Sequence, residues 1–147
     1  MRMVIQRVKE AAVRVDGQIV SEIKKGALVL LGVQKTDIPA YTVWMAQKLI
    51  SLRYFSDTEG KMNLSLQDIE GGLLIVSQFT LYANCHEGRR PGFEAAAPGG
   101  VAKMMYDKFV EEVKREIKEV QTGIFGADME VSLVNDGPVT FVVDYPN

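Results

Sequence analysis

The first third of the chain alternates apolar and polar residues, a pattern typical of β-strands with one buried face. One such segment covers residues 3–8, and two more, 12–15 and 18–23, flank Asp16-Gly17. An Asp-Gly pair between alternating segments predicts a tight hairpin, because both residues tolerate positive φ angles. The continuous apolar segment 27–33 predicts instead a strand that is buried on both faces.

Two later segments repeat apolar residues with the period of about 3.6 that is typical of amphipathic helices. The first helix is predicted to begin near Asp37, which can cap it, with Pro39 in its first turn, and to end near Ser51. The second is predicted over about 101–119. Its polar face alternates acidic and basic side chains, which is typical of a solvated surface and not of an RNA-binding ridge. Its apolar face comprises Ala102, Met105, Phe109, Val113, Ile117 and Val120.

The second half of the chain adds three predicted strands. Segment 73–81 is expected to be a second inner strand, and segments 129–134 and 139–143 are separated by a break at 135–138. A loop rich in Gly, Pro and Arg fills 84–100. This order of elements predicts an α/β or α+β fold, with a mixed β-sheet and helices on one face. We expect a homodimer to complete or cover the other face.

Length and composition fit one domain over residues 1–147, with 47% hydrophobic and 24% charged residues. The formal charge of −2 and the pI near 5.5 disfavour a wide basic surface for nucleic acid. Neither a signal-peptide pattern nor an apolar stretch of about 20 residues occurs. We therefore expect a cytoplasmic protein that does not bind membranes.

The metal-binding residue types are scarce. The chain has one cysteine, Cys85, and one histidine, His86, which disfavours thiolate-rich or histidine-based zinc sites. The scattered carboxylates Asp57, Glu59 and Asp68 lack a ligand spacing. We predict no metal and no cofactor.

The first candidate site is Ser77-Gln78-Phe79-Thr80, at the end of a predicted buried strand. Sites tend to form at such strand ends in open α/β sheets. Ser77 and Thr80 offer hydroxyls, and Gln78 offers an amide that can polarise a carbonyl. The alternative is that these groups only satisfy the backbone as the strand leaves the core. A hydroxyl nucleophile also needs a base, and none is adjacent in sequence.

Four further candidates each have a plain structural alternative. Gly137-Pro138 fits a hairpin turn or a cis peptide, and Arg89-Arg90 fits phosphate binding or ordinary surface charge. Cys85-His86 could form a nucleophile pair, but sequence neighbours are poorly placed for it. Arg7 could face solvent, pair with a carboxylate, or brace a loop that presents carbonyl groups.

Several motifs occur together, in order, over Met1 to about Val143, and in this combination the chain strongly resembles the D-aminoacyl-tRNA deacylase family. The motifs are Met1-Arg2-x-Val4-Ile5-Gln6-Arg7-Val8, Gly60-Lys61-Met62-Asn63-Leu64-Ser65, Ser77-Gln78-Phe79-Thr80-Leu81-Tyr82-Ala83, Gly88-Arg89-Arg90-Pro91, Phe125-Gly126-Ala127-Asp128-Met129 and Asn135-Asp136-Gly137-Pro138-Val139-Thr140.

The resemblance implies a small dimeric α/β enzyme with its sites at the subunit interface. Such an enzyme hydrolyses the ester of D-aminoacyl-tRNA, removes glycine mischarged onto tRNA, and rejects L-aminoacyl-tRNA. It further implies that Gly137-Pro138 is cis and reaches into the partner's pocket, and that Arg7 holds this loop. Residues 77–80 would line the pocket, with Phe125 and Met129 on the substrate-binding side.

The resemblance leaves two mechanisms open. In one, Thr80 is the nucleophile; in the other, a water molecule attacks with help from the 2′-OH of the terminal adenosine. We favour the second, with Thr80 and N–H groups near Phe79 stabilising the developing charge. Arg89 and Arg90 are expected tRNA contacts, although residues 84–87 depart from the family pattern. Alternative functions are an RNA- or nucleotide-binding module without activity, a structural dimer, and a hydrolase that depends on Cys85.

Overall fold

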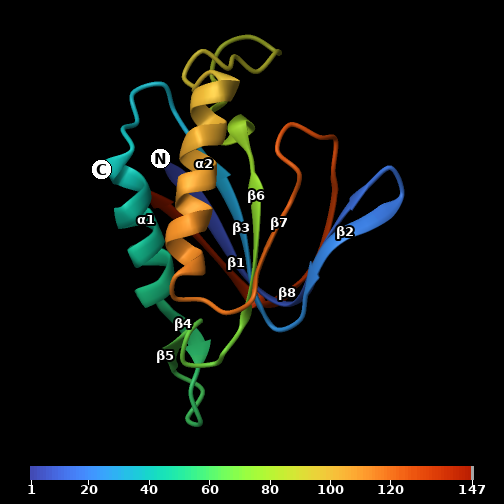
Figure 1. Ribbon diagram of the computed structural model, residues 1–147, viewed down its shortest axis with the longest axis vertical. Coiled ribbons are helices and arrows are strands. Elements are labelled where there is room, and N and C mark those ends of the chain that lie inside the picture. Colours follow the sequence, from blue (N-terminus) through green and yellow to red (C-terminus); the bar gives the residue numbers. More distant parts are fainter. Residues whose placement is uncertain (147) are drawn as a thin grey trace.

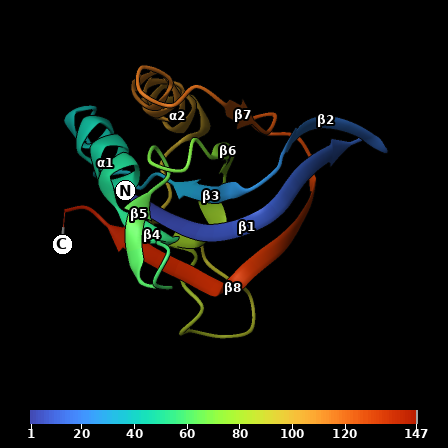
Figure 2. The ribbon, with the colours of Figure 1, turned by 90° about the horizontal axis from the view of Figure 1, so that it is seen from below.

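Strand β1 (Arg2–Val15) organises the sheet, because it pairs with three other strands in the computed structural model, which describes residues 1–146. Its first half runs antiparallel to β3 (Gly26–Gly32), and its second half runs antiparallel to β2 (Gln18–Ile23). β8 (Glu130–Asp144) runs antiparallel along its other edge. The two segments predicted within β1 are therefore parts of one long, curved strand (Figure 2).

The connection between β1 and β2 is the predicted hairpin. Asp16 and Gly17 form its turn with φ angles of 50° and 76°. Both residues occupy the left-handed region that Asp and Gly tolerate best, so the local chemistry explains the turn.

The centre of the sheet is parallel, so the sheet is mixed, as predicted. β3 pairs with β6 (Gly72–Ser77), which pairs with β7 (Val120–Thr122). Both β3 and β6 are buried almost throughout. Their close approach requires glycine, because a Cβ on Gly26 would lie 1.8 Å from the carbonyl oxygen of Gly72.

The prediction of a strand over 73–81 is wrong at its end. β6 stops at Ser77, and Phe79–Tyr82 form a short 3₁₀ turn, η1. Gln78 N–H still donates to the carbonyl oxygen of Leu31 at 2.8 Å, near the end of β3. Beyond that point no strand remains to pair with, so the chain turns.

Helix α1 (Ala40–Ser51) ends where predicted but is not capped by Asp37. Its N-cap is Pro39, which makes no side-chain cap bond. The Asp37 carboxylate is instead buried, where it accepts hydrogen bonds from the Met1 ammonium at 2.6 Å and from Gln34 N–H at 2.8 Å. The buried ion pair outcompetes the local capping role.

Helix α2 (Gly99–Lys114) ends earlier than the predicted 119. Ile117 still reaches the core, but the chain then turns so that Leu73 N–H donates to the Glu119 carbonyl at 2.9 Å. Val120 therefore begins β7 and does not continue the helix. The spacing of apolar residues alone could not show whether Val120 belongs to the end of the helix or to the start of a strand.

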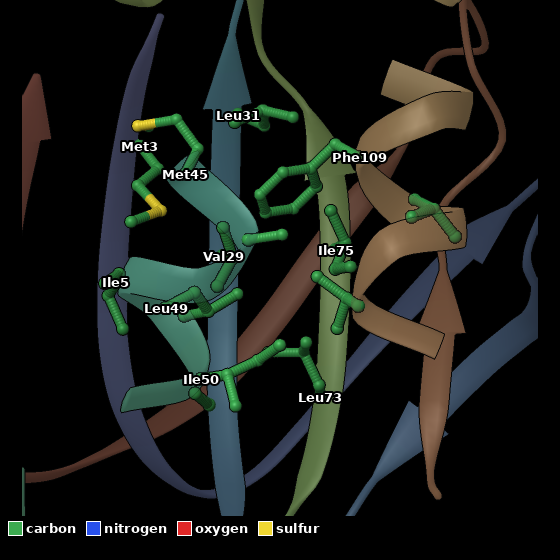
Figure 3. Packing of buried hydrophobic residues seen from close by; sticks show 14 of the residues in the cluster. Met3, Ile5, Val29, Leu31, Met45, Leu49, Ile50, Leu73, Ile75 and Phe109 are labelled. Atoms are coloured by element: carbon green, nitrogen blue, oxygen red, sulfur yellow. The ribbon is translucent and has the colours of Figure 1, made fainter. Parts of the chain in front are cut away.

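The two helices pack against each other and cover one face of the sheet (Figures 1 and 2). The main core lies between the two helices and the sheet, as Figure 3 shows. From the sheet and from the helices, respectively, it contains Met3, Ile5, Val29, Leu31, Leu73 and Ile75, and Met45, Leu49, Ile50 and Phe109.

A smaller core occupies the other face of the sheet. Leu28, Leu74 and Val76 pack there against the curled second half of β1 and the first half of β8. The chain therefore covers part of the face that the sequence analysis assigned to a partner.

The predicted break at 135–138 is a bulge within β8, not a gap between two strands. Gln6 pairs with Thr140 and Val8 pairs with Asn135, so residues 136–139 lie opposite Arg7 alone. The segment projects from the ladder while the strand continues on both sides.

A two-stranded sheet, β4 (Arg53–Ser56) and β5 (Met62–Ser65), flanks a turn at 57–60. Among the described residues, no helix combines the length and the apolar character needed to cross a bilayer.

Candidate active site

The turn after β6 carries the first group of predicted residues. Gln78 Nε2 donates a hydrogen bond to Thr80 Oγ1 at 2.5 Å. The Thr80 hydroxyl therefore accepts from the protein and keeps its own proton for another acceptor. Both Phe79 and Thr80 are exposed, so a ligand can reach them.

The same turn leaves backbone donors open. Within the described residues, the N–H groups of Phe79 and Thr80 make no hydrogen bond to the protein, because they begin η1 and follow the last strand contact of Gln78. Two N–H groups beside a hydroxyl can stabilise a carbonyl oxygen on which negative charge develops.

A cavity of about 470 Å³ brings most of the predicted pocket residues together. Ser77, Gln78 and Phe79 line one wall, and Phe125 and Met129 lie on the wall formed by residues 125–129. Thr80 is next to the cavity in sequence but does not line it. The remaining lining residues are Val33, Val76, Ala97, Gly99, Ala102 and Val131.

The wall at 125–129 is fixed by residues that the sequence analysis did not select. Tyr106 OH donates to the Ile75 carbonyl at 2.7 Å, and its ring lies 5.9 Å from that of Phe125. Burial raises the pKa of Tyr106, so this hydroxyl keeps its proton. A Cβ on Gly123 would lie 2.7 Å from Met129 Sδ, so glycine there lets Met129 occupy the wall.

Gly137 and Pro138 do not line this cavity. Their peptide bond is cis, as the resemblance implies, and both residues are exposed on the β8 bulge. Arg7 Nε donates to the Asp136 carbonyl at 2.9 Å, and Arg7 Nη1 donates to the Tyr54 carbonyl at 2.8 Å. The Arg7 guanidinium thus ties the bulge to β4.

Asn135 is a second brace that sequence reasoning missed. Its Oδ1 accepts from Val139 N–H at 2.7 Å, and its Nδ2 donates to Thr140 Oγ1 at 3.1 Å. Gly137 has a φ angle of 145°, and a Cβ there would lie 2.7 Å from Val139 Cγ2 and 3.2 Å from Arg7 Nη2. Only glycine therefore fits without displacing the braces.

Arg89 and Arg90 lie on an exposed loop that the Asn84–Gly92 backbone pair closes, with N···O distances of 2.8 and 2.9 Å. Neither arginine makes an ion pair within residues 1–146. Cys85 and His86 are exposed on this loop too, and no hydrogen bond joins their side chains within the same range. The geometry thus provides Cys85 with no bonded base.

Metal ligands do not gather in the described part of the chain, where no three His, Cys, Asp or Glu side chains form a group that could hold an ion. Of the described residues around the cavity, Asp128 alone is charged. The site therefore consists of hydroxyl, amide and backbone donors beside an apolar hollow.

These features define a small α/β domain that can hold a ligand at a strand end and polarise its carbonyl. A family model described as D-Tyr-tRNA(Tyr) deacylase matches residues 4–144. The chain belongs to this family and is a hydrolase.

Relatives and solved structures agree with this assignment. The D-aminoacyl-tRNA deacylase of Geotalea uraniireducens is 56% identical over 146 residues, covering 99% of this chain and 94% of the relative. That of Desulfotalea psychrophila is 58% identical over 144 residues, covering 98% and 97%.

Among solved structures, the "c-Myc DNA Unwinding Element Binding Protein" matches with a TM-score of 0.94 and 37% identity over 100% of both chains. A probable eukaryotic D-amino acid tRNA deacylase matches with a TM-score of 0.86 and 17% identity over 97% of both chains, a likeness of fold alone.

Proposed function

We propose that this protein proofreads tRNA charging by hydrolysing the ester between a D-amino acid or glycine and tRNA, while sparing L-aminoacyl-tRNA. The observation that supports it most is the turn at 77–80, which presents unbonded N–H donors and a hydroxyl beside a ligand-sized cavity. Relatives similar along nearly the whole chain are named D-aminoacyl-tRNA deacylase. Charged tRNA is in the cytoplasm, where we expect the protein to act.

The catalytic step we infer is attack by water, assisted by the RNA. The N–H groups of Phe79 and Thr80 and the Thr80 hydroxyl hold the ester carbonyl as its oxygen becomes negative. The water oxygen bonds to the carbonyl carbon, the ester C–O bond breaks, and the water proton passes through the terminal adenosine 2′-OH to the leaving 3′-oxygen.

Thr80 is a poor nucleophile in this arrangement. Its Oγ1 accepts the Gln78 amide hydrogen, which draws electron density away from the oxygen. Of the described residues, none with a basic side chain is hydrogen-bonded to Thr80. We therefore assign Thr80 to carbonyl stabilisation.

The stereochemical filter is proposed to come from a second copy of the chain. Gly137 and Pro138 are exposed, braced by Arg7 and Asn135, and outside the cavity of their own chain. In a homodimer with its active sites at the interface, this bulge would enter the partner's cavity. Main-chain atoms there would exclude an L side chain, accept any D side chain, and leave glycine unopposed.

The tRNA contact is proposed to be small. Arg89 and Arg90 are exposed and carry charges that suit phosphate oxygens. The net charge of −2 disfavours a wide basic groove, so binding should depend only weakly on salt concentration.

The decisive experiment compares hydrolysis of D-aminoacyl-, L-aminoacyl- and glycyl-tRNA at matched concentrations. We expect the D and glycyl esters to be cleaved and the L ester to survive. If tRNA binds but no ester is cleaved, the protein is a binding module, and the hydroxyl and N–H groups at 77–80 are structural. A Cys85→Ser variant that lost activity would instead support the thiol-dependent alternative.

A further inference from the structure

Three neighbouring strands each contribute one residue to a row that contacts the turn η1. Arg2 of β1 pairs with Gly32 of β3 on one side and with Asp144 of β8 on the other. Side chains alternate along a strand, and the next side chain, that of Met3, enters the main core between the helices and the sheet. The row Asp144–Arg2–Gly32 therefore lies on the face of the sheet away from the helices.

The Arg2 guanidinium joins this row to the turn. Its Nη1 donates to the Leu81 carbonyl at 3.0 Å, and its Nε and Nη2 donate to the two carboxylate oxygens of Asp144 at 2.7 and 3.1 Å. Its Cζ lies 5.4 Å from the centroid of the Tyr82 ring, within the range of a cation–π contact. Three directed bonds from one planar group fix its own orientation and the place of the Leu81 carbonyl.

The turn also packs closely on Gly32, the member of the row in β3. A Cβ on Gly32 would lie 3.1 Å from Leu81 Cβ and 3.2 Å from Tyr82 Cδ2. Contacts this short would push the turn outward by a few tenths of an ångström. Glycine at this position therefore lets η1 rest directly on β3, while Arg2 binds the end of the turn from β1.

We propose that Arg2 is a positioning residue for ester hydrolysis, which holds η1 where the N–H groups of Phe79 and Thr80 meet the carbonyl oxygen. The inference rests on the proposed function, because it assigns a support to those two N–H groups. They directly precede Leu81, in a turn closed by the bond from Ala83 N–H to the Thr80 carbonyl at 3.0 Å. A shift of the Leu81 carbonyl therefore moves both donors.

Arg2 and Arg7 belong to the same strand but support different parts of the molecule. Arg7 binds the carbonyl groups of Asp136 and Tyr54 and braces the bulge of β8, whereas Arg2 binds the turn after β6. Donors that meet a developing negative charge act mainly in the transition state. Loss of Arg2 should therefore slow the hydrolysis of D-aminoacyl and glycyl esters alike, and leave the rejection of L-aminoacyl esters unchanged.

Single-turnover hydrolysis of D-aminoacyl-tRNA tests this role, at a temperature where circular dichroism shows each variant to be folded. We expect Arg2→Ala to lower the maximal rate by about 10-fold and to change the enzyme concentration for half-maximal rate by less than about 2-fold, because displaced donors weaken the transition state. Arg115→Ala is the matched control. Arg115 also pairs with a carboxylate, that of Glu112 at 2.6 Å, but it lies at the end of α2 remote from the cavity.

Two further changes test the other members of the row. If Asp144 acts by orienting Arg2, Asp144→Ala should slow hydrolysis, and the double variant should be no slower than Arg2→Ala alone. Gly32→Ala should slow hydrolysis because the added methyl group presses on η1. Gly100→Ala is its control, since a Cβ there would meet no atom within 4 Å, and it should keep the wild-type rate.

Amide hydrogen exchange provides a readout that needs no substrate. In Arg2→Ala, the Ala83 N–H, which donates to the Thr80 carbonyl, should exchange severalfold faster than in wild type. The N–H groups of the buried strand β6 should keep their wild-type exchange rates. A general loss of stability would instead accelerate exchange in β6 as well, so this measurement separates local support of η1 from a contribution to overall stability.

Three results would overturn the inference. A wild-type maximal rate in Arg2→Ala would show that the turn keeps its place without this residue. Equal acceleration of exchange in η1 and β6 would reduce Arg2 to a general contribution to stability, and hydrolysis of L-aminoacyl-tRNA by Arg2→Ala would assign it to the bulge. If wild type hydrolyses no ester, the proposed function fails, and the exchange experiment still decides whether Arg2 holds η1.

Discussion

The two regions that carry the proposed function are built in opposite ways. Among the described residues, the turn at 77–80 leaves backbone donors unbonded beside a cavity, whereas the bulge at 136–139 has polar groups tied by Arg7 and Asn135 and does not line that cavity. A region with open donors can receive a ligand. A braced, exposed projection can shape a ligand site only where another surface accepts it.

The two regions also lie in different parts of the fold. β6 ends beside the start of α2, while β8 runs along β1 on the side of the sheet away from the helices (Figures 1 and 2). The cavity and the bulge therefore belong to different edges of the fold. If both act in one reaction, the two halves of each site come from two chains.

The largest expected effect comes from changing Gly137. A Cβ at its φ of 145° would clash with Val139 and crowd Arg7, so Gly137→Ala should displace the bulge. We expect the kcat/KM for D-aminoacyl-tRNA to fall by about 100-fold or more, since misplacement of about 1 Å near a reaction can cost that much. Single-turnover hydrolysis by the purified variant measures it.

Mixing two impaired variants, one changed in the bulge and one in the cavity wall, tests whether the two halves of a site come from different chains. Gly137→Ala keeps an intact cavity, and Gln78→Ala keeps an intact bulge. Random exchange of subunits should restore about one quarter of the sites, because each mixed dimer combines one good cavity with one good bulge. No recovery in a mixture that demonstrably forms mixed dimers would place both halves in one chain.

Changing Thr80 should have the next largest effect and addresses the cavity side alone. Removing one donor to a developing oxyanion costs about 100- to 1,000-fold at most, and the two N–H groups would remain in Thr80→Ala. We therefore expect a loss of about 10- to 100-fold, with Thr80→Ser close to wild type. Complete loss of single-turnover hydrolysis with RNA binding retained would favour a Thr80 nucleophile.

A moderate effect is expected for Arg7. Arg7→Ala removes two charge-assisted hydrogen bonds and leaves the Asp136 and Tyr54 carbonyls without their donor, which should cost about 2–4 kcal/mol of unfolding free energy. Urea unfolding measures the loss. The control is Arg14→Ala, because Arg14 is exposed and makes one long bond of 3.5 Å to the Gly17 carbonyl. Equal stability of the two variants would show that the brace is energetically unimportant.

The sequence predicted which helices and strands are present better than it predicted the residues at which they begin and end. Period and turn chemistry located the Asp16-Gly17 hairpin, the inner strands and both helices, because these signals are local. The end of β6 and the start of β7 depend on which partner strand remains available, which local periodicity does not show. Asp37 has a capping pattern, yet it binds an ammonium group that is distant in sequence.

In the candidate site, too, some residues could be predicted from the sequence and others could not. Motifs pointed to Ser77, Gln78 and Phe79, and the structure gathers them in one cavity with Phe125 and Met129. Supporting residues such as Tyr106 and Gly123 gave no signal, because their roles depend on contacts between elements. Asn135 belongs to one of the motifs, but the motif did not show that its side chain braces the bulge. The contact between the rings of Phe79 and Phe93 could not be predicted from the sequence either, because it joins two segments that are separate along the chain.

The smallest effect is expected for Tyr106, which supports the cavity without contacting a substrate. Tyr106→Phe removes the hydrogen bond to the Ile75 carbonyl and should lower the unfolding free energy by about 1 kcal/mol at neutral pH. Because burial raises the pKa of Tyr106 in the folded state, its contribution to stability is present below the unfolded pKa of about 10 and is lost as pH rises above it. Unfolding measured from pH 8 to 11 should therefore show a shallower alkaline loss in Tyr106→Phe than in wild type. Parallel curves for the two proteins would mean that the Tyr106 hydroxyl is not held protonated by burial, and the wall at 125–129 would then need another support.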